Sequence, residues 1–429
     1  MNISKTNSSR GDYLLSISII GILFFVFGFI TWLNSTLIPF LKTSCELNNF
    51  QAYLVTLAFY ISYFVMAIPS SWVLKKTGFK AGMAAGLLIM AAGSLLFVPA
   101  AMTRTYGLFI TALFIQGTGL CVLQTASNPY VTILGPIESA ARRISIMGIC
   151  NKVAGFMGPL VLSVIVLKNF EAIEKQLELT IGAAEKEILL TGMAERVIVP
   201  YIIITASLLI LALFIRLSPI PDIDISEINK NNGSVPVSEK STIFKYPYLL
   251  LGFLAIFFYV GAEVISIDTI TLYGKSQGVV MDDARLYPLM PLFGMVIGYI
   301  IGIILIPKYI KQGRALGIAA VLGMAFSVIA VFMQGFTSVV FIALLGLANA
   351  VMWPAIWPLA IEGLGKYMKT GSAILIMGIV GGALLPLLYG KLADLPCIGN
   401  RQAYWILLPC YIFILFFAVS GHKIGKKKS

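Results

Sequence analysis

The stretch SPIPDIDISEINKNNGSVPVSEK, residues Ser218–Lys240, is polar and charged, and apolar segments lie on both sides of it. Its proline, asparagine, glycine and charged residues are typical of a solvated linker. Outward from this stretch, six runs of roughly 20 apolar residues precede it and six follow it. We therefore expect a first bundle in residues 1–217, a linker in 218–243 and a second bundle in 244–429.

The composition excludes a soluble globular protein. The chain has 429 residues, of which 59% are hydrophobic and 12% are charged, whereas soluble domains carry about one quarter charged residues. The predicted fold is all-α and membrane-embedded, with twelve transmembrane helices in two six-helix bundles. The spans are expected near 13–41, 50–74, 81–102, 105–130, 143–168, 196–217, 244–274, 285–307, 315–333, 338–361, 370–391 and 401–421.

The positive charges indicate the orientation of these spans. The first apolar run shows no small-residue cleavage site, so we interpret it as a retained span rather than a signal peptide. Lys and Arg are about twice as frequent in the loops on the side of the termini and the central linker, which predicts that these parts are cytoplasmic. The net charge of +12 thus reflects topology, and no nucleic-acid partner is expected. On the other side, residues 169–195 have helical character and predict a surface helix of unassigned role.

Nothing in the sequence predicts an enzyme or a cofactor. The five cysteines form no metal-ligand spacing and three of them lie within spans, so neither a metal site nor a disulfide framework is expected. No nucleotide motif occurs, and the single histidine, His422, lies in the basic tail. Since the spans contain no histidine and no plausible pair of nucleophile and base, an embedded enzyme is disfavoured.

The two halves share weak similarity. ISIMGICNKVAGFMGPL in span five and AILIMGIVGGALLPL in span eleven both contain Met-Gly-Ile followed by Pro-Leu. Two six-span halves with corresponding Gly- and Pro-rich helices predict a transporter whose site lies between the halves. The alternative is that these residues only permit close helix packing.

Four stretches together identify a family resemblance. They are FGFITWLNSTLIPFLK (Phe27–Lys42), LQTASNPYVTILGP (Leu123–Pro136), FYVGAEVISI (Phe258–Ile267) and NAVMWPAIWPLAIEGLGKYMKTGSAILIMGIVGGALLPLLYG (Asn349–Gly390). These stretches resemble the fucose permease and glucose/galactose permease branch of the major facilitator superfamily. The first of them is most similar to the bacterial glucose/galactose members. The resemblance implies the major facilitator fold and a sugar permease of the cell inner (cytoplasmic) membrane that works by alternating access.

The resemblance also bears on ion coupling. In the proton-coupled fucose permease, span one carries an aspartate and span four a glutamate, where this chain has Ser35 and Gln124. Neither residue exchanges a proton near neutral pH. The family's asparagine in span five is retained as Asn151. The coupling ion, proton or sodium, is therefore left open.

Polar and aromatic residues inside the spans are the candidate sugar site. A neutral polyol needs groups that both donate and accept hydrogen bonds, and aromatic faces for the apolar side of its ring. The candidates for substrate binding are Asn34, Gln124, Asn128, Asn151, Asn349, Trp353 and Trp357. The alternatives are hydrogen bonds between helices for the amides and lipid contact for the tryptophans. The prolines beside the two tryptophans predict a bend in span ten.

Charged residues within or beside the spans are candidates for coupling or gating. Glu263 lies well inside span seven, whereas Asp268 is nearer the outer end, where solvent would reach it. Lys152 lies in span five about nine residues from the cytoplasmic end, so its ammonium could snorkel. Charges at depth are usually paired or functional. Arg142 and Arg143, after span four, are expected in a cytoplasmic gating turn.

The sequence thus predicts a secondary transporter for a neutral hexose, glucose or galactose. Its expected partners are this monosaccharide and the lipid bilayer, and no obligate protein partner is evident. A fucose-type symporter and an uncoupled sugar facilitator are the alternatives among transporters. A membrane sugar sensor on the same fold is the alternative of another class, but the chain lacks large soluble signalling tails.

Overall fold

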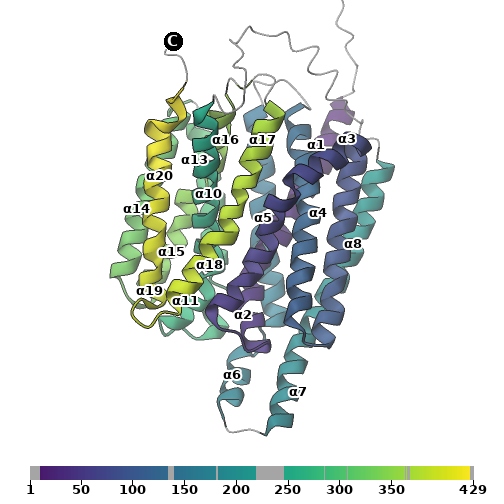
Figure 1. Ribbon diagram of the computed structural model, residues 1–429, viewed down its shortest axis with the longest axis vertical. Helices are drawn as coiled ribbons and strands as arrows, with labels where there is room; N and C mark the ends of the chain where they lie inside the picture. The colour runs from purple at the N-terminus through teal and green to yellow at the C-terminus, as the bar shows by residue number, and fades with distance from the viewer. Residues whose placement is uncertain are drawn as a thin grey trace, which may run out of the picture.

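A computed structural model of the protein describes residues 10–133, 140–179, 182–218, 246–284, 286–306, 308–362, 364 and 368–425. Within these residues the chain forms helices and no β-strand. Figure 1 shows the helices as two groups side by side, with the N-terminal half (purple to teal) at the right and the C-terminal half (green to yellow) at the left. The predicted all-α membrane fold is confirmed.

Each predicted span corresponds to a helical segment. Among the described residues, eleven segments are long and apolar enough to cross a membrane, and the shorter helix Leu289–Leu305 matches the eighth expected span. The N-terminal half contains α1 (Arg10–Trp32), α2 (Asn34–Ser44), α3 (Asn49–Met102), α4 (Tyr106–Ile133), α5 (Ala140–Val166), α6 (Phe170–Glu178), α7 (Ala183–Ala194) and α8 (Ile198–Leu217). The C-terminal half contains α10 (Pro247–Asp268), α11 (Ile270–Ser276), α12 (Met281–Ala284), α13 (Leu289–Leu305), α14 (Gln312–Phe332), α15 (Gly335–Asn349), α16 (Met352–Ile361), α17 (Met368–Met377), α18 (Gly381–Ala393), α19 (Gly399–Gln402) and α20 (Leu407–Val419). Of the expected linker, 218–243, all but Ser218 lies outside the described residues.

Several spans are interrupted where the backbone loses a regular hydrogen bond. Span ten divides between α15 and α16, because Pro354 has no N–H to donate to the carbonyl of Ala350. The bend predicted from the prolines is therefore confirmed. Spans two and three form one element, α3, with a kink at Gly78, where φ of 78° requires the left-handed region that glycine tolerates. Span one divides at Leu33 and span seven at Thr269.

The segment 169–195 forms two helices, not the single surface helix that the sequence predicts. Figure 1 shows α6 and α7 projecting together beyond one end of the bundles, which we call the hairpin end. Phe170 and Ile173 are buried, so α6 packs its apolar side against the protein. The C-terminal end of α20 lies at the opposite end (Figure 1).

A glycine sets the distance between α1 and α5. A Cβ atom added to Gly28 would lie 1.7 Å from the backbone oxygen of Asn151. Only glycine permits this approach, because any side chain would displace one helix from the other. The contact brings the middle of α5, with Asn151 and Lys152, against the first span.

Candidate functional site

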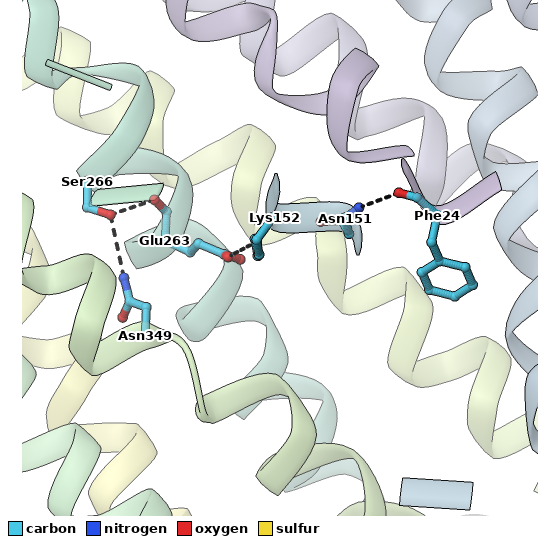
Figure 2. Close-up of polar contacts among 6 residues, drawn as sticks. All are labelled: Phe24, Asn151, Lys152, Glu263, Ser266 and Asn349. Atoms are coloured by element: carbon cyan, nitrogen blue, oxygen red, sulfur yellow. Dashed lines mark hydrogen bonds and ion pairs between the residues drawn. The ribbon is translucent and has the colours of Figure 1, made fainter. Parts of the chain in front are cut away.

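A buried ion pair joins the two halves. Lys152 Nζ of α5 lies 2.6 Å from Glu263 Oε1 of α10, and their side chains are only 7% and 8% exposed. Figure 2 shows the two side chains directed toward each other from opposite helices. The ammonium of Lys152 also lies 4.5 Å from the ring centroid of Trp32. Lys152 therefore does not snorkel to the surface, because its charge is compensated inside the protein.

Two predicted amides lie on the N-terminal side of this pair. Asn151 Nδ2 donates to the backbone oxygen of Phe24 at 3.3 Å, and Figure 2 shows its side chain directed away from Lys152 toward α1. Gln124 Nε2 donates to the hydroxyl of Tyr63 at 3.1 Å. Both amides are half-buried. Each is thus held by one hydrogen bond in a defined position and still reaches accessible space.

Asn34 begins α2, directly after the break in span one. Its side chain is buried, and its Nδ2 atom has no hydrogen-bond partner within the part of the chain that the structure describes. A buried donor without a partner is rare in native proteins and calls for a ligand or an ordered water. The predicted site residues Asn128, Arg142 and Arg143 have side chains that lie outside those described.

Asn349 is engaged within the C-terminal half. The hydroxyl of Tyr411 donates to its Oδ1 at 2.9 Å, and its Nδ2 lies 3.5 Å from Ser266 Oγ on α10. Ser266 Oγ in turn donates to the backbone oxygen of Glu263 at 2.7 Å (Figure 2). The amide thereby ties α15 and α20 to the helix that carries Glu263. This arrangement favours a positioning role over direct contact with a substrate.

Trp353 and Trp357 lie on one face of α16. Their ring centroids are 5.4 Å apart with an interplanar angle of 25°, so the two indoles stack on each other. Trp353 also lies 6.3 Å from the ring of Tyr259, one helical turn before Glu263 on α10. Both residues are half-buried.

The structure places Asp268 differently from what the sequence predicts. Its position near the end of span seven suggested contact with solvent, but the residue is 0% exposed. Thr56 Oγ1 of α3 donates to its Oδ2 at 3.3 Å, whereas its Oδ1 has no partner among the described residues. The expectation was wrong because α3, from the other half, covers the place where α10 ends.

Polar contacts join the two halves at the hairpin end. Asp394, the residue directly after α18, accepts hydrogen bonds from Asn49 Nδ2 at 2.5 Å and from the backbone nitrogen of Phe50 at 2.8 Å. Glu174 of α6 pairs with Lys275 of α11 at 2.5 Å. These contacts cross from the N-terminal to the C-terminal half. They hold the two halves together at this end.

Sequence reasoning missed several residues that the tertiary structure brings to the site. Trp32 contacts Lys152, Tyr63 holds Gln124, and Thr56 holds Asp268. The signal for Trp32 was present, because it lies in the polar interruption TWLNS of span one. Tyr63 and Thr56 lie in an otherwise apolar span, and their partners are more than 60 residues away in the sequence.

Comparison with known proteins identifies the family to which this two-bundle fold belongs. A family model described as Major Facilitator Superfamily matches residues 20–386. A glucose/galactose transporter of Brucella abortus biovar 1 (strain 9-941) is 33% identical over 420 residues, which cover 97% of this chain and 96% of the relative. An L-fucose-proton symporter of Escherichia coli (strain K12) is 30% identical over 427 residues, which cover 97% and 95% of the two chains. The crystal structure of the superfamily transporter FucP in the outward conformation has a TM-score of 0.72 and 28% identity, over 95% of this chain and 98% of FucP. The chain therefore belongs to the Major Facilitator Superfamily, in its branch of sugar permeases.

Proposed function

We propose that the protein moves a neutral hexose, glucose or galactose, across the membrane by alternating access. The observation that carries this proposal is the polar centre between the halves, where Lys152 and Glu263 neutralise each other and amides lie beside them. A site of zero net charge with several amides suits a polyol better than an ion. The names of the relatives, glucose/galactose transporter and L-fucose-proton symporter, support sugar as the substrate class.

In this proposal the polar and aromatic residues have separate roles. Asn34, Gln124 and Asn151 hydrogen-bond the sugar, with Asn128 as a further candidate from the same face of span four as Gln124. Trp353 and Trp357 offer an aromatic wall. Asn349 supports α10 from behind, as its contacts with Tyr411 and Ser266 favour. Arg142 and Arg143 act in gating at the end opposite the hairpin.

The coupling step is assigned to the buried charges. Ser35 and Gln124 carry no ionisable group, so proton-driven accumulation must pass through Glu263 or Asp268, and sodium is the other candidate coupling ion. Glu263 bridges to the N-terminal half through Lys152, and Asp268 does so through Thr56. Both carboxyl groups therefore lie where a change of charge alters the contact between the halves. A fucose-type symporter and an uncoupled facilitator are the alternatives.

The orientation in this proposal follows the positive charges. The termini and the central linker face the cytoplasm, and the hairpin end faces outward. The contacts of Asp394 and Glu174 then close the outer side. The relatives come from bacteria, which supports the cell inner membrane as the location.

Uptake into proteoliposomes tests the function. The purified protein is reconstituted, and labelled glucose, galactose and fucose are supplied with proton and sodium gradients imposed separately. Saturable uptake of glucose or galactose, competed by neither amino acids nor organic anions, is the expected result. Saturable uptake of an anionic substrate in preference to every hexose would contradict the proposal. Equal uptake with and without either gradient would identify a facilitator.

A further inference from the structure

Trp32 lies at the contact between the halves. It is the last residue of α1, and it is 3% exposed. It belongs to a buried apolar cluster with Ile267, Leu292, Met295, Tyr299 and Ala350 of the C-terminal half, and Ile149 of the N-terminal half packs against this cluster. A residue of the N-terminal half that packs against the other half changes its environment when the two halves rock.

The position of the Trp32 ring depends on a close approach to α5. A Cβ atom added to Gly155 would lie 2.3 Å from Cδ1 of Trp32. The indole therefore lies directly on the backbone of α5, one turn after Lys152, whose ammonium lies 4.5 Å from the ring centroid. Helix packing thus fixes the indole beside the Lys152–Glu263 pair.

Two donors at this break are buried and unused. Trp32 Nε1 and Asn34 Nδ2 have no hydrogen-bond partner in the described portions of the chain. An indole nitrogen only donates, so its N–H requires an acceptor to offset the loss of water. These two donors, two residues apart at an interruption of span one, therefore call for acceptors that enter from outside the chain.

We propose that Trp32 is a sugar-contacting residue of the transport site, and that its indole N–H donates to one sugar hydroxyl while the Asn34 amide donates to another. The proposal rests on the proposed function and deepens it. Lys152 and Glu263 already neutralise each other beside the ring, so the acceptors that best fit the two donors are uncharged. The hydroxyls of a pyranose provide several such acceptors.

Deoxy sugars combined with Trp32→Phe test the proposal. Phenylalanine keeps an aromatic ring but lacks the N–H. In the parent protein, one monodeoxy analogue of the transported hexose should compete about tenfold less well than the hexose, because it lacks the acceptor. In Trp32→Phe, the hexose itself should bind about tenfold less well, and that one analogue should show no further loss. Trp405→Phe is the matched control, because Trp405 is partly exposed and its N–H is held by Gln402.

The outcomes separate this inference from the proposed function. If the parent protein transports hexoses but Trp32→Phe weakens every analogue by the same factor, the indole N–H contacts no particular hydroxyl and the inference is overturned. If no hexose is transported by the parent protein, the proposed function itself fails. A ¹⁹F spectrum of the 5-fluorotryptophan-labelled parent protein covers the case in which Trp32→Phe does not fold. The Trp32 signal, assigned by replacing the other four tryptophans one at a time, should shift on sugar addition, and an unmoved signal at saturation would also overturn the inference.

Discussion

Glu263→Gln tests the cross-bundle ion pair most directly. The change removes the carboxylate charge with little change in side-chain size and leaves Lys152 in place. Because the two side chains are only 7% and 8% exposed, the ammonium cannot regain its hydration without separating the halves. The variant thus creates a buried cation without its counter-ion.

The expected loss in the free energy of unfolding follows from the contacts that Lys152 loses and retains. Breaking a buried ion pair by removing one partner costs about 3–5 kcal/mol. The contact with the Trp32 ring is retained, and a desolvated cation–π contact contributes about 2 kcal/mol. The new amide oxygen also accepts a hydrogen bond from the ammonium. We therefore expect the free energy of unfolding to fall toward the lower end of that range, by about 3 kcal/mol.

Denaturant unfolding in detergent and transport in proteoliposomes measure the two consequences. The stability of Glu263→Gln is compared with that of Lys152→Met combined with Glu263→Gln, which removes both charges and should recover most of the loss. In proteoliposomes, Glu263→Gln should abolish gradient-driven accumulation more than sugar exchange at equilibrium. A single variant as stable as the parent protein would refute the ion-pair reasoning, and equal loss of accumulation and exchange would assign Glu263 to folding or binding instead of coupling.

Three further changes test other parts of the argument. Gln124→Ala should weaken sugar binding by about 1–3 kcal/mol, since a polar partner is left unsatisfied, and unchanged affinity in equilibrium exchange would leave Gln124 as a helix-packing residue. Gly28→Ala should lower the melting temperature in detergent and reduce uptake, because the new methyl group overlaps the Asn151 carbonyl, and a parent-like melting curve would contradict the close approach of α1 and α5. Glu174→Lys should increase labelling of cysteines placed between the halves at the hairpin end, and adding Lys275→Glu should reverse this increase. The ion pair should stabilise the contact by only about 0.2–1 kcal/mol, because it is partly exposed. If the second change does not reverse the labelling, the pair is no outer latch.

The sequence alone predicted the fold, because the thickness of the bilayer sets the length of each apolar span. Runs of apolar residues predicted all twelve spans, since a helix must be about 20 residues long to cross the hydrocarbon core. Pro354 also marked a real interruption, because proline lacks the N–H that a regular helix would use at this point. The segment 169–195 was only partly predicted, because its division into two helices is not set by the bilayer.

The candidate site required the tertiary structure. Sequence identified Lys152, Glu263 and Asp268 as unusual charges, because any charge among apolar residues is conspicuous. It could not show that Lys152 meets Glu263, that Thr56 holds Asp268, or that Trp353 and Trp357 stack on each other.

These contacts depend on how two separately formed bundles face each other. Hydropathy specifies which residues lie in the membrane, but it carries no information about the rotation of a helix about its axis or about its neighbours in the other half. That rotation is set by close packing, as where α1 lies on α5 at Gly28 and Trp32 lies on Gly155. The amino-acid sequence therefore determined the number and course of the spans, whereas packing between helices decided which buried charges and donors meet.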